Sequence, residues 1–278
     1  MSFDPGQLGR SQADLAQTLR ALRKQAGLTG DRLARRCNMS QSQISKFETG
    51  RRIPGPVDVE RILRALGTPR EIADEVTALA RVANTEWQGK RSSWRQGAEK
   101  RQTELRSLES EAAELRYFLP AMITGLLATP EYMAAGLGHV PGNRAGIVDR
   151  KVARQAVLHD TSKTFTFLLS EQAVRWAIVP APDMARQIDR LVMVSRLPNV
   201  RIGVLPIGTV MPRGPMNTFT VYDERLVTVE NFTGRIVFRD FRDISEHLSV
   251  FSVFEECALF GGEARELLAR WADELRDL

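Results

Sequence analysis

The sequence contains little cysteine and histidine, and this excludes several classes of protein. Cys37 and Cys257 are the only cysteines among 278 residues, and the three histidines stand apart from one another. Without a CxxC pair or a Cys/His cluster, neither a disulfide framework nor a structural zinc site is expected. We therefore predict a chain that holds no metal and no cofactor.

Long apolar runs are also missing. No window of about 20 apolar residues occurs, so no membrane span is expected. The opening residues, MSFDPGQLGR, contain no apolar stretch of the kind found in secretory leaders. The expected location is therefore the cytoplasm, and no membrane partner is expected.

Recognisable catalytic motifs are absent as well. There is no HExxH or GxSxG run, and Gly203–Gly208 has the spacing of a phosphate loop but is followed by Thr209 instead of lysine. We therefore do not expect an enzyme. Because catalytic triads assemble in space, an enzyme tethered to DNA stays open as an alternative.

Positive charge is concentrated in the first part of the chain. The net charge is +5, and residues 1–100 hold 18 Lys and Arg against 11 Asp and Glu. The remaining 178 residues are slightly acidic, with 21 basic and 23 acidic side chains. A localised basic excess fits a polyphosphate partner such as double-stranded DNA.

The N-terminal part has the apolar spacing of five helices. Leu15, Leu19 and Leu22 recur at helical intervals, and Thr29 and Ser40 are suited to cap the second and third helices. The expected helices cover residues 11–26, 29–37, 41–49, 57–66 and 71–86. We predict an all-α domain over residues 1–86, followed by a linker helix over residues 87–104.

Two of these helices have the layout of a helix-turn-helix. Leu33, Ala34, Ile44 and Phe47 are expected to pack the second helix against the third. The outward face of the third helix is then polar at its start, as base reading requires, because glutamine, serine and lysine match base edges in the major groove. The predicted base contacts are Gln41, Ser42, Ser45 and Lys46.

A second set of residues is placed for DNA phosphates. Thr29 and Ser40 precede helix N-termini, which favour anions, and Arg51 and Arg52 follow the third helix directly. Such contacts fix the register on DNA without reading sequence. The predicted phosphate contacts are Thr29, Ser40, Gln43, Arg51 and Arg52.

The run MSQSQISKFETGRRIP, which starts at Met39, resembles the helix-turn-helix of the XRE family of repressor and Cro-like regulators. The resemblance covers residues 15–66. It places the family's base-contact positions on Gln41, Ser42 and Lys46. Gly30 stands where the family usually has a glutamine that binds phosphate.

Residues 105–278 alternate helical and β-type patterns. Helices are expected at 105–117, 147–159, 183–196, 242–259 and 262–277, and another begins at Thr129. Strands are expected at 164–169, 200–206, 219–222, 226–229 and 235–238. The fold class is therefore multidomain: an all-α helix-turn-helix domain, then an α/β (α+β) domain with a mixed sheet over residues 105–278.

This second domain resembles the C-terminal part of antitoxin-like XRE regulators, which carry a large partner-sensing domain. The pieces that carry the resemblance are Leu108-Glu109, Gly125–Tyr132, Arg150, Arg154-Gln155, Val204–Pro206 and Ala258-Leu259. Ala128 replaces a usual glutamine. The resemblance implies a small partner protein encoded nearby.

The sequence leaves several alternatives open for the second domain. An apolar groove around Leu126, Leu127 and Tyr132 is a candidate partner site, and the same residues are equally readable as core. A small-molecule sensor and an antitoxin that sequesters its partner are the other possibilities. A homodimer is expected, because one recognition helix covers few bases.

Overall fold

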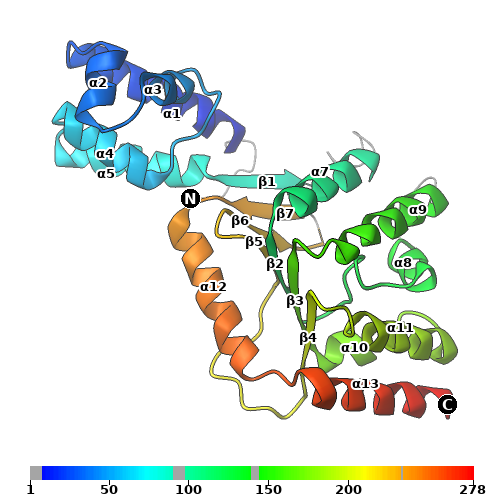
Figure 1. The fold of residues 1–278 in the computed structure, drawn as a ribbon. Helices are drawn as coiled ribbons and strands as arrows, with labels where there is room; N and C mark the ends of the chain where they lie inside the picture. Colours follow the sequence, from blue (N-terminus) through cyan, green and yellow to red (C-terminus); the bar gives the residue numbers. More distant parts are fainter. Residues whose placement is uncertain (1–7, 90–97, 139–143, 233) are drawn as a thin grey trace. The chain divides into compact units, whose positions relative to one another are not determined.

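The computed structural model describes residues 8–89, 98–138, 144–232 and 234–278 (Figure 1). The chain forms two compact units. The first contains Met1–Gln88 together with Ile236–Ile244, and the second contains Gly89–Arg235 and Ser245–Leu278.

Five helices build the first unit, as the sequence predicts. They are α1 (Leu8–Gln25), α2 (Gly30–Arg36), α3 (Gln41–Glu48), α4 (Pro56–Leu66) and α5 (Arg70–Ala83). Their apolar stripes meet in one core, in which Leu15, Leu33, Ile44, Phe47 and Val59 are almost fully buried. The core positions of α2 and α3 are those that the helical spacing predicts.

The first unit also receives a short segment from late in the chain. The strands β1 (Thr85–Gly89) and β7 (Gly234–Phe238) are neighbours, and the Arg239 N–H donates to the Asn84 carbonyl (3.1 Å). The predicted domains, 1–86 and 105–278, are each continuous in sequence, so the prediction does not place this late segment in the first unit. The expected linker helix at 87–104 is replaced by the end of β1 and the start of a later helix, and its residues 90–97 lie outside the described residues.

The second unit is built on a mixed sheet. Its strands are β2 (Glu114–Leu119), β3 (Thr164–Ser170), β4 (Val200–Leu205), β5 (Thr218–Tyr222) and β6 (Leu226–Glu230), in the order β6-β5-β2-β3-β4. The pairs β2–β3 and β3–β4 are parallel, whereas β2–β5 and β5–β6 are antiparallel. The mixed α/β fold class is therefore confirmed.

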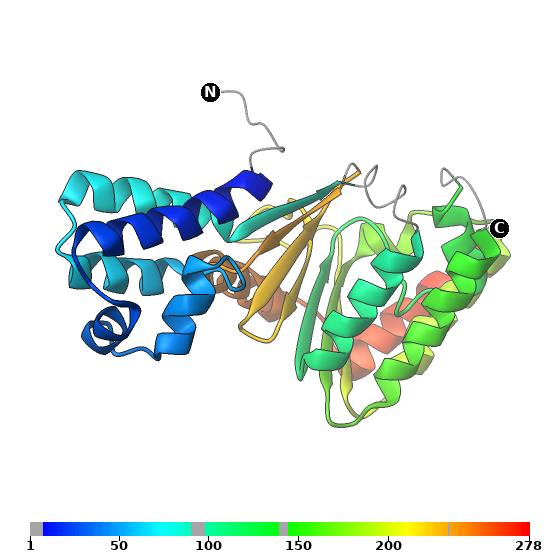
Figure 2. The same ribbon diagram turned by 90° about the horizontal axis from the view of Figure 1, so that it is seen from above.

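Helices lie on both faces of this sheet (Figures 1 and 2). Phe251 and Phe254 of α12 (Phe241–Glu256) pack on Phe118 and Phe219 of the sheet. The helices α7 (Ala98–Glu111) and α9 (Arg144–Arg154) lie on the opposite side. The remaining elements are α8 (Pro130–Gly136), a 3-10 helix (Gln155–His159), α10 (Glu171–Arg175), α11 (Ala181–Val194) and α13 (Gly261–Arg276).

The expected helix at 105–117 is wrong in its second half. The helix α7 ends at Glu111, and β2 begins at Glu114. Leu105, Leu108, Ala112 and Leu115 happen to continue a helical spacing, which hides the strand. From Leu115 the burial is that of a central strand paired on both sides, which the local sequence does not reveal.

Several expected helices also end earlier than predicted, and two of them show why. Helix α5 stops at Ala83, because the Asn84 side chain bonds the Pro54 and Ala80 carbonyls and ends the helix. Helix α9 stops at Arg154 and continues as the 3-10 helix. Over the described residues, no helix combines the length and the apolarity that a membrane crossing needs.

Candidate functional site

The turn between α2 and α3 sets the angle of the two helices. Cys37 ends α2, and Asn38 adopts a left-handed conformation with a φ of 52°. The Met39 N–H then donates to the Ala34 carbonyl (2.9 Å), which closes the turn. Asparagine tolerates this backbone region better than most residues, so the sequence supports the turn locally.

The exposed face of α3 carries the residues predicted to contact bases. Ile44 and Phe47 are buried against α2 and the rest of the core. The four side chains predicted to contact bases are all exposed: Gln41, Ser42, Ser45 and Lys46. The structure thus brings the predicted base contacts together on one helix face, which begins at the first turn.

A capping box fixes the start of α3. The Gln43 N–H donates to Ser40 Oγ (3.1 Å), and the Ser40 N–H donates to Gln43 Oε1 (2.9 Å). Both residues are predicted to contact phosphate. The acceptor oxygens of both side chains are used within the protein, so the Gln43 amide N–H groups and the Ser40 hydroxyl proton stay available as donors.

A bidentate ion pair anchors the other end of α3. Arg23 Nε and Nη2 lie 2.6 and 2.7 Å from the two Glu48 carboxylate oxygens, and Nη1 donates to the Leu28 carbonyl (2.8 Å). Hydrogen bonding to Glu48 raises the pKa of Arg23 above its ordinary value. One guanidinium therefore ties α1, the loop before α2 and the end of α3 together.

The remaining predicted phosphate contacts border this face of α3. Thr29 caps α2 by accepting the Arg32 N–H (3.3 Å) and is exposed. Arg51 and Arg52 are exposed beyond the end of α3, and the Arg52 guanidinium lies 5.9 Å from the Phe47 ring centroid. A Cβ added at Gly30 would lie 3.9 Å from Gln41 Nε2, so the start of α2 adjoins the start of α3.

The second unit contains a buried ion pair between α7 and α9. Arg154 Nε and Nη2 lie 2.8 and 2.7 Å from the two Glu109 oxygens, and Nη1 donates to Gln102 Oε1 (2.5 Å). Both charged side chains are almost fully buried. Burial raises the pKa of Glu109, and Arg154 acts against that shift. The pair holds the two helices in register.

Two glutamines hold the loop that precedes α8. The Gln155 amide donates to the Gly125 and Ala128 carbonyls (2.8 Å each), and Gln187 donates to the Leu127 carbonyl (3.0 Å). The Thr129 N–H donates to Gln187 Oε1 (2.7 Å), and the Thr129 hydroxyl caps α8. These contacts define the backbone between residues 125 and 129.

The buried ion pair and the loop before α8 lie in a region that matches one protein family. The family described as a domain of unknown function (DUF5753) matches residues 102–270, which is more than half of the chain. The chain belongs to the DUF5753 family. The matched region contains the Glu109–Arg154 pair and the glutamine-held loop.

A second family, described as a helix-turn-helix domain, matches residues 14–76. This match covers α2, the turn and α3, so the DUF5753 chain carries a helix-turn-helix DNA-binding domain in its N-terminal part. The comparison with curated proteins gives no match.

Solved structures add a weak likeness. The chain is 12% identical to TrmBL2, described as an archaeal chromatin protein that shows a novel mode of DNA binding. The likeness extends over 78% of this chain and 68% of that chain, with a TM-score of 0.33. This likeness is too weak to indicate a shared fold or a shared function.

The predicted partner residues lie in the core of the DUF5753 domain. Leu126 and Leu127 are fully buried, and Tyr132 is 2% exposed and accepts the Ile123 N–H (3.3 Å). Side chains so enclosed stabilise the fold and offer no surface to a partner. The core interpretation of these residues therefore replaces the partner-site interpretation.

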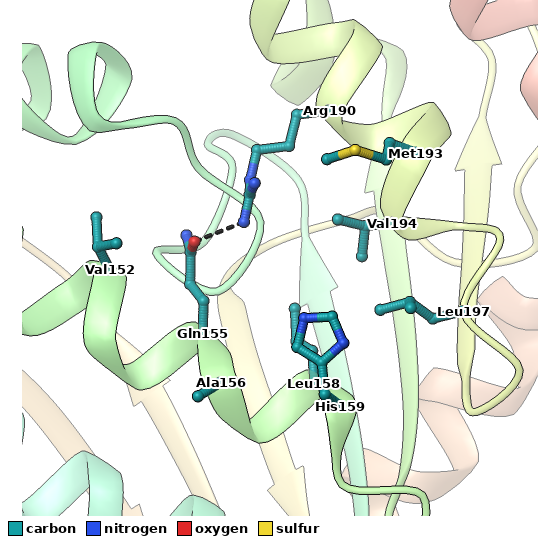
Figure 3. Close-up of a pocket in the computed structure, with 9 residues that line it drawn as sticks. All are labelled: Val152, Gln155, Ala156, Leu158, His159, Arg190, Met193, Val194 and Leu197. Carbon is teal, nitrogen blue, oxygen red and sulfur yellow. Dashed lines mark hydrogen bonds between the residues drawn. The ribbon is translucent and has the colours of Figure 1, made fainter.

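A pocket of about 400 Å³ opens between the 3-10 helix and α11 (Figure 3). Arg190 points into it and donates to Gln155 Oε1, as Figure 3 shows. Arg190 forms no ion pair with any described residue, and burial lowers its pKa. Met193 and Val152 are exposed apolar side chains at the same pocket.

Sequence reasoning misses the residues that hold these sites in place. Arg23 and Glu48 are 25 positions apart, and no local pattern links them. Gln187 is different, because it is fully buried on the apolar face of α11 beside Met184 and Ile188. A polar residue at that helical position is a visible signal of a buried hydrogen-bonding role.

Proposed function

We propose that this chain is a sequence-specific transcriptional regulator of the XRE type that reads DNA through the exposed face of α3. The observation that carries the proposal is the joint exposure of Gln41, Ser42, Ser45 and Lys46 at a capped, rigidly anchored helix. Glutamine matches adenine, and lysine matches guanine acceptors, in the major groove.

The surroundings of α3 support a phosphate-binding border. Thr29, Ser40 and Gln43 lie at helix starts, and Arg51 and Arg52 follow the helix directly. A border of such donors fixes the register of the base-reading face. In this proposal the protein acts in the cytoplasm, as a homodimer, and is not an enzyme.

We also propose that a small partner protein, encoded nearby, modulates DNA binding through the DUF5753 domain. The antitoxin-like resemblance supports this role, and the pocket at Arg190 supplies a surface for it. The guanidinium has no carboxylate partner among the described residues, and Met193 is 59% exposed beside it. A partner with an acidic side chain next to an apolar one fits this surface.

Binding to the chain's own upstream DNA tests the main proposal. The full chain is titrated against that region and against random DNA at two salt concentrations. We expect a specificity ratio of roughly 10³ or more that persists at the higher salt. Equal affinities for the two DNAs, lost together as salt rises, would reject sequence-specific reading by α3.

Co-expression tests the partner proposal. The chain is produced with each small protein encoded beside it, and complexes are separated by size. We expect one complex, which Arg190→Glu disrupts and Arg186→Glu, an exposed control on the same helix, leaves intact. A complex unaffected by Arg190→Glu, or no complex with any neighbour, contradicts this docking surface.

A further inference from the structure

The second unit holds a cavity of about 610 Å³ between the sheet and α7, α9 and the loop before α8. It is distinct from the pocket at Arg190. Its volume falls in the range of about 300–1,000 Å³ that small-molecule sites occupy. Its floor is the face of β2 and β5 that carries Tyr117, Thr220 and Tyr222.

Two hydroxyls on that floor have no hydrogen-bond partner in the part of the chain that the structure describes. Thr220 is 7% exposed and Tyr222 is 4% exposed, and neither hydroxyl has a hydrogen-bond partner among the described residues. Both hydroxyl oxygens are accessible to solvent-sized molecules, and both residues line the cavity. Both hydroxyls can therefore hydrogen-bond to an oxygen of a molecule in the cavity.

The pairing of β2 with β5 fixes the positions of the side chains on the cavity floor. Thr220 lies opposite Tyr117, and Tyr222 lies two residues along the same face of β5. Tyr117 is held by its own contacts, since its ring stacks on Phe167 with centroids 4.7 Å apart and its hydroxyl faces Glu109 (3.4 Å). The Thr220 and Tyr222 hydroxyls therefore stand on a rigid surface.

The charges of the Glu109–Arg154 pair cancel within the cavity. Both residues line it, but they are bound to each other through two short contacts. The third Arg154 contact goes to Gln102, so no charged donor of this pair is left for a ligand anion. Lys151 and Glu230 are the other charged residues that line the cavity, and each has an interaction of its own. An ion entering here would lose its hydration and gain no counter-charge from the Glu109–Arg154 pair, which favours an uncharged ligand.

The walls and mouth are apolar. Leu119, Ile123 and Ile147 are buried side chains of the wall. Met216 and Phe232 line the opening and are 85% and 96% exposed. Exposed apolar side chains beside a cavity mouth are typical of a binding site.

We propose that this cavity binds an uncharged, amphipathic small molecule that presents an oxygen to Thr220 and Tyr222 and an apolar body to the walls. The cavity accommodates a molecule on the order of 20 heavy atoms. The site is independent of DNA binding and of the partner surface, so it stands or falls separately from the proposed function.

Nile red, a neutral dye with a carbonyl oxygen and an apolar ring system, tests the site on the full chain. We expect saturable binding of one dye per chain with a blue-shifted emission. Thr220→Val and Tyr222→Phe, which remove only the hydroxyl function, should each weaken binding about three- to tenfold. Thr166→Val removes an equally buried threonine hydroxyl on β3, away from the cavity, and should leave binding unchanged.

The anionic dye anilinonaphthalene sulfonate supplies the second arm. We expect it to bind at least tenfold more weakly than Nile red. The proposal is overturned if Nile red does not saturate, if the cavity variants and Thr166→Val behave alike, or if the anionic dye binds as tightly as the neutral one. Circular dichroism of each variant verifies that the fold is retained.

Discussion

Gln41 stands at the first turn of α3, and it combines exposure with a side chain that can read adenine. Gln41→Ala should weaken binding to the specific site by about 1–3 kcal/mol and leave random DNA almost unaffected. Gln25→Ala, at the exposed end of α1, is the matched control. Fluorescence anisotropy with both DNAs measures the effect, and equal losses on the two would exclude base reading.

Arg51 differs from Gln41 because a phosphate contact carries no sequence information. Arg51→Ala should weaken binding to specific and random DNA alike and flatten the slope of log K against log salt by about one unit. Arg270→Ala, an exposed substitution on α13, gives the same change of net charge. A slope that does not change, or that changes equally in the control, contradicts the phosphate role.

Cys37 and Cys257 report on the two units separately. Burial raises the pKa of the Cys37 thiol, which is 1% exposed and donates to the Arg61 carbonyl. Cys257 is only partly buried. At pH 8 a thiol reagent should therefore modify Cys257 first and reach Cys37 when the helical unit opens, because less thiolate and less access both slow the reaction. Mass spectrometry of the native protein provides the measurement, and equal rates would contradict it.

At the scale of the element, α3 depends on what holds it from behind. Glu48→Ala removes the carboxylate that pairs with Arg23 and leaves a guanidinium that is only 14% exposed. We expect a loss of about 2–3 kcal/mol in the free energy of unfolding, since an unpaired, largely buried charge is costly. Urea denaturation followed by circular dichroism measures it.

An exposed ion pair serves as the control for Glu48→Ala. Asp31→Ala breaks the pair with Arg35 on α2, whose side chains are 57% and 80% exposed. It should change stability by less than about 0.5 kcal/mol, because surface pairs contribute little. If the two variants destabilise the chain equally, the Arg23–Glu48 pair does not anchor α3.

The helices of the first unit are predictable because their signals are local. Thr29 and Ser40 cap the helices that the sequence predicts they cap, and Gly27 and Gly67 have the positive φ of helix ends. The strand β2 is missed because its identity depends on two partner strands far away in sequence. No periodicity within residues 105–119 contains that information.

The candidate sites also divide into a part that local sequence predicts and a part that depends on contacts between distant residues. The face of α3 can be drawn from a helical wheel once the helix is known. The pairing of Arg154 with Glu109 spans 45 positions, and the cavity floor brings β2 next to β5 across a long stretch of intervening chain. Contacts of this kind are set by tertiary packing, which a single sequence does not display.

At the scale of the whole molecule, the proposed dimer makes a geometric prediction. A protein with one short recognition helix per chain reads two half-sites, whose centres lie about one helical turn, roughly 10–10.5 base pairs, or a multiple of it apart. Footprinting on the upstream region should show two related protected sites. Mass photometry of the complex should show two chains on that DNA, and a single chain on a single site would contradict the homodimer.

The segment Ile236–Ile244 gives the DNA-binding unit a discontinuous coding sequence. A recombination event that moved only residues 1–88 would leave behind the N–H that Arg239 donates to Asn84 and the Arg242 side chain that pairs with Glu60. The unit is therefore poorly suited to exchange as a cassette between genes. On the proposed mode of DNA reading, new sequence preferences are more accessible through point substitutions on the exposed face of α3, where Gln41, Ser42, Ser45 and Lys46 can change without disturbing the core beneath them.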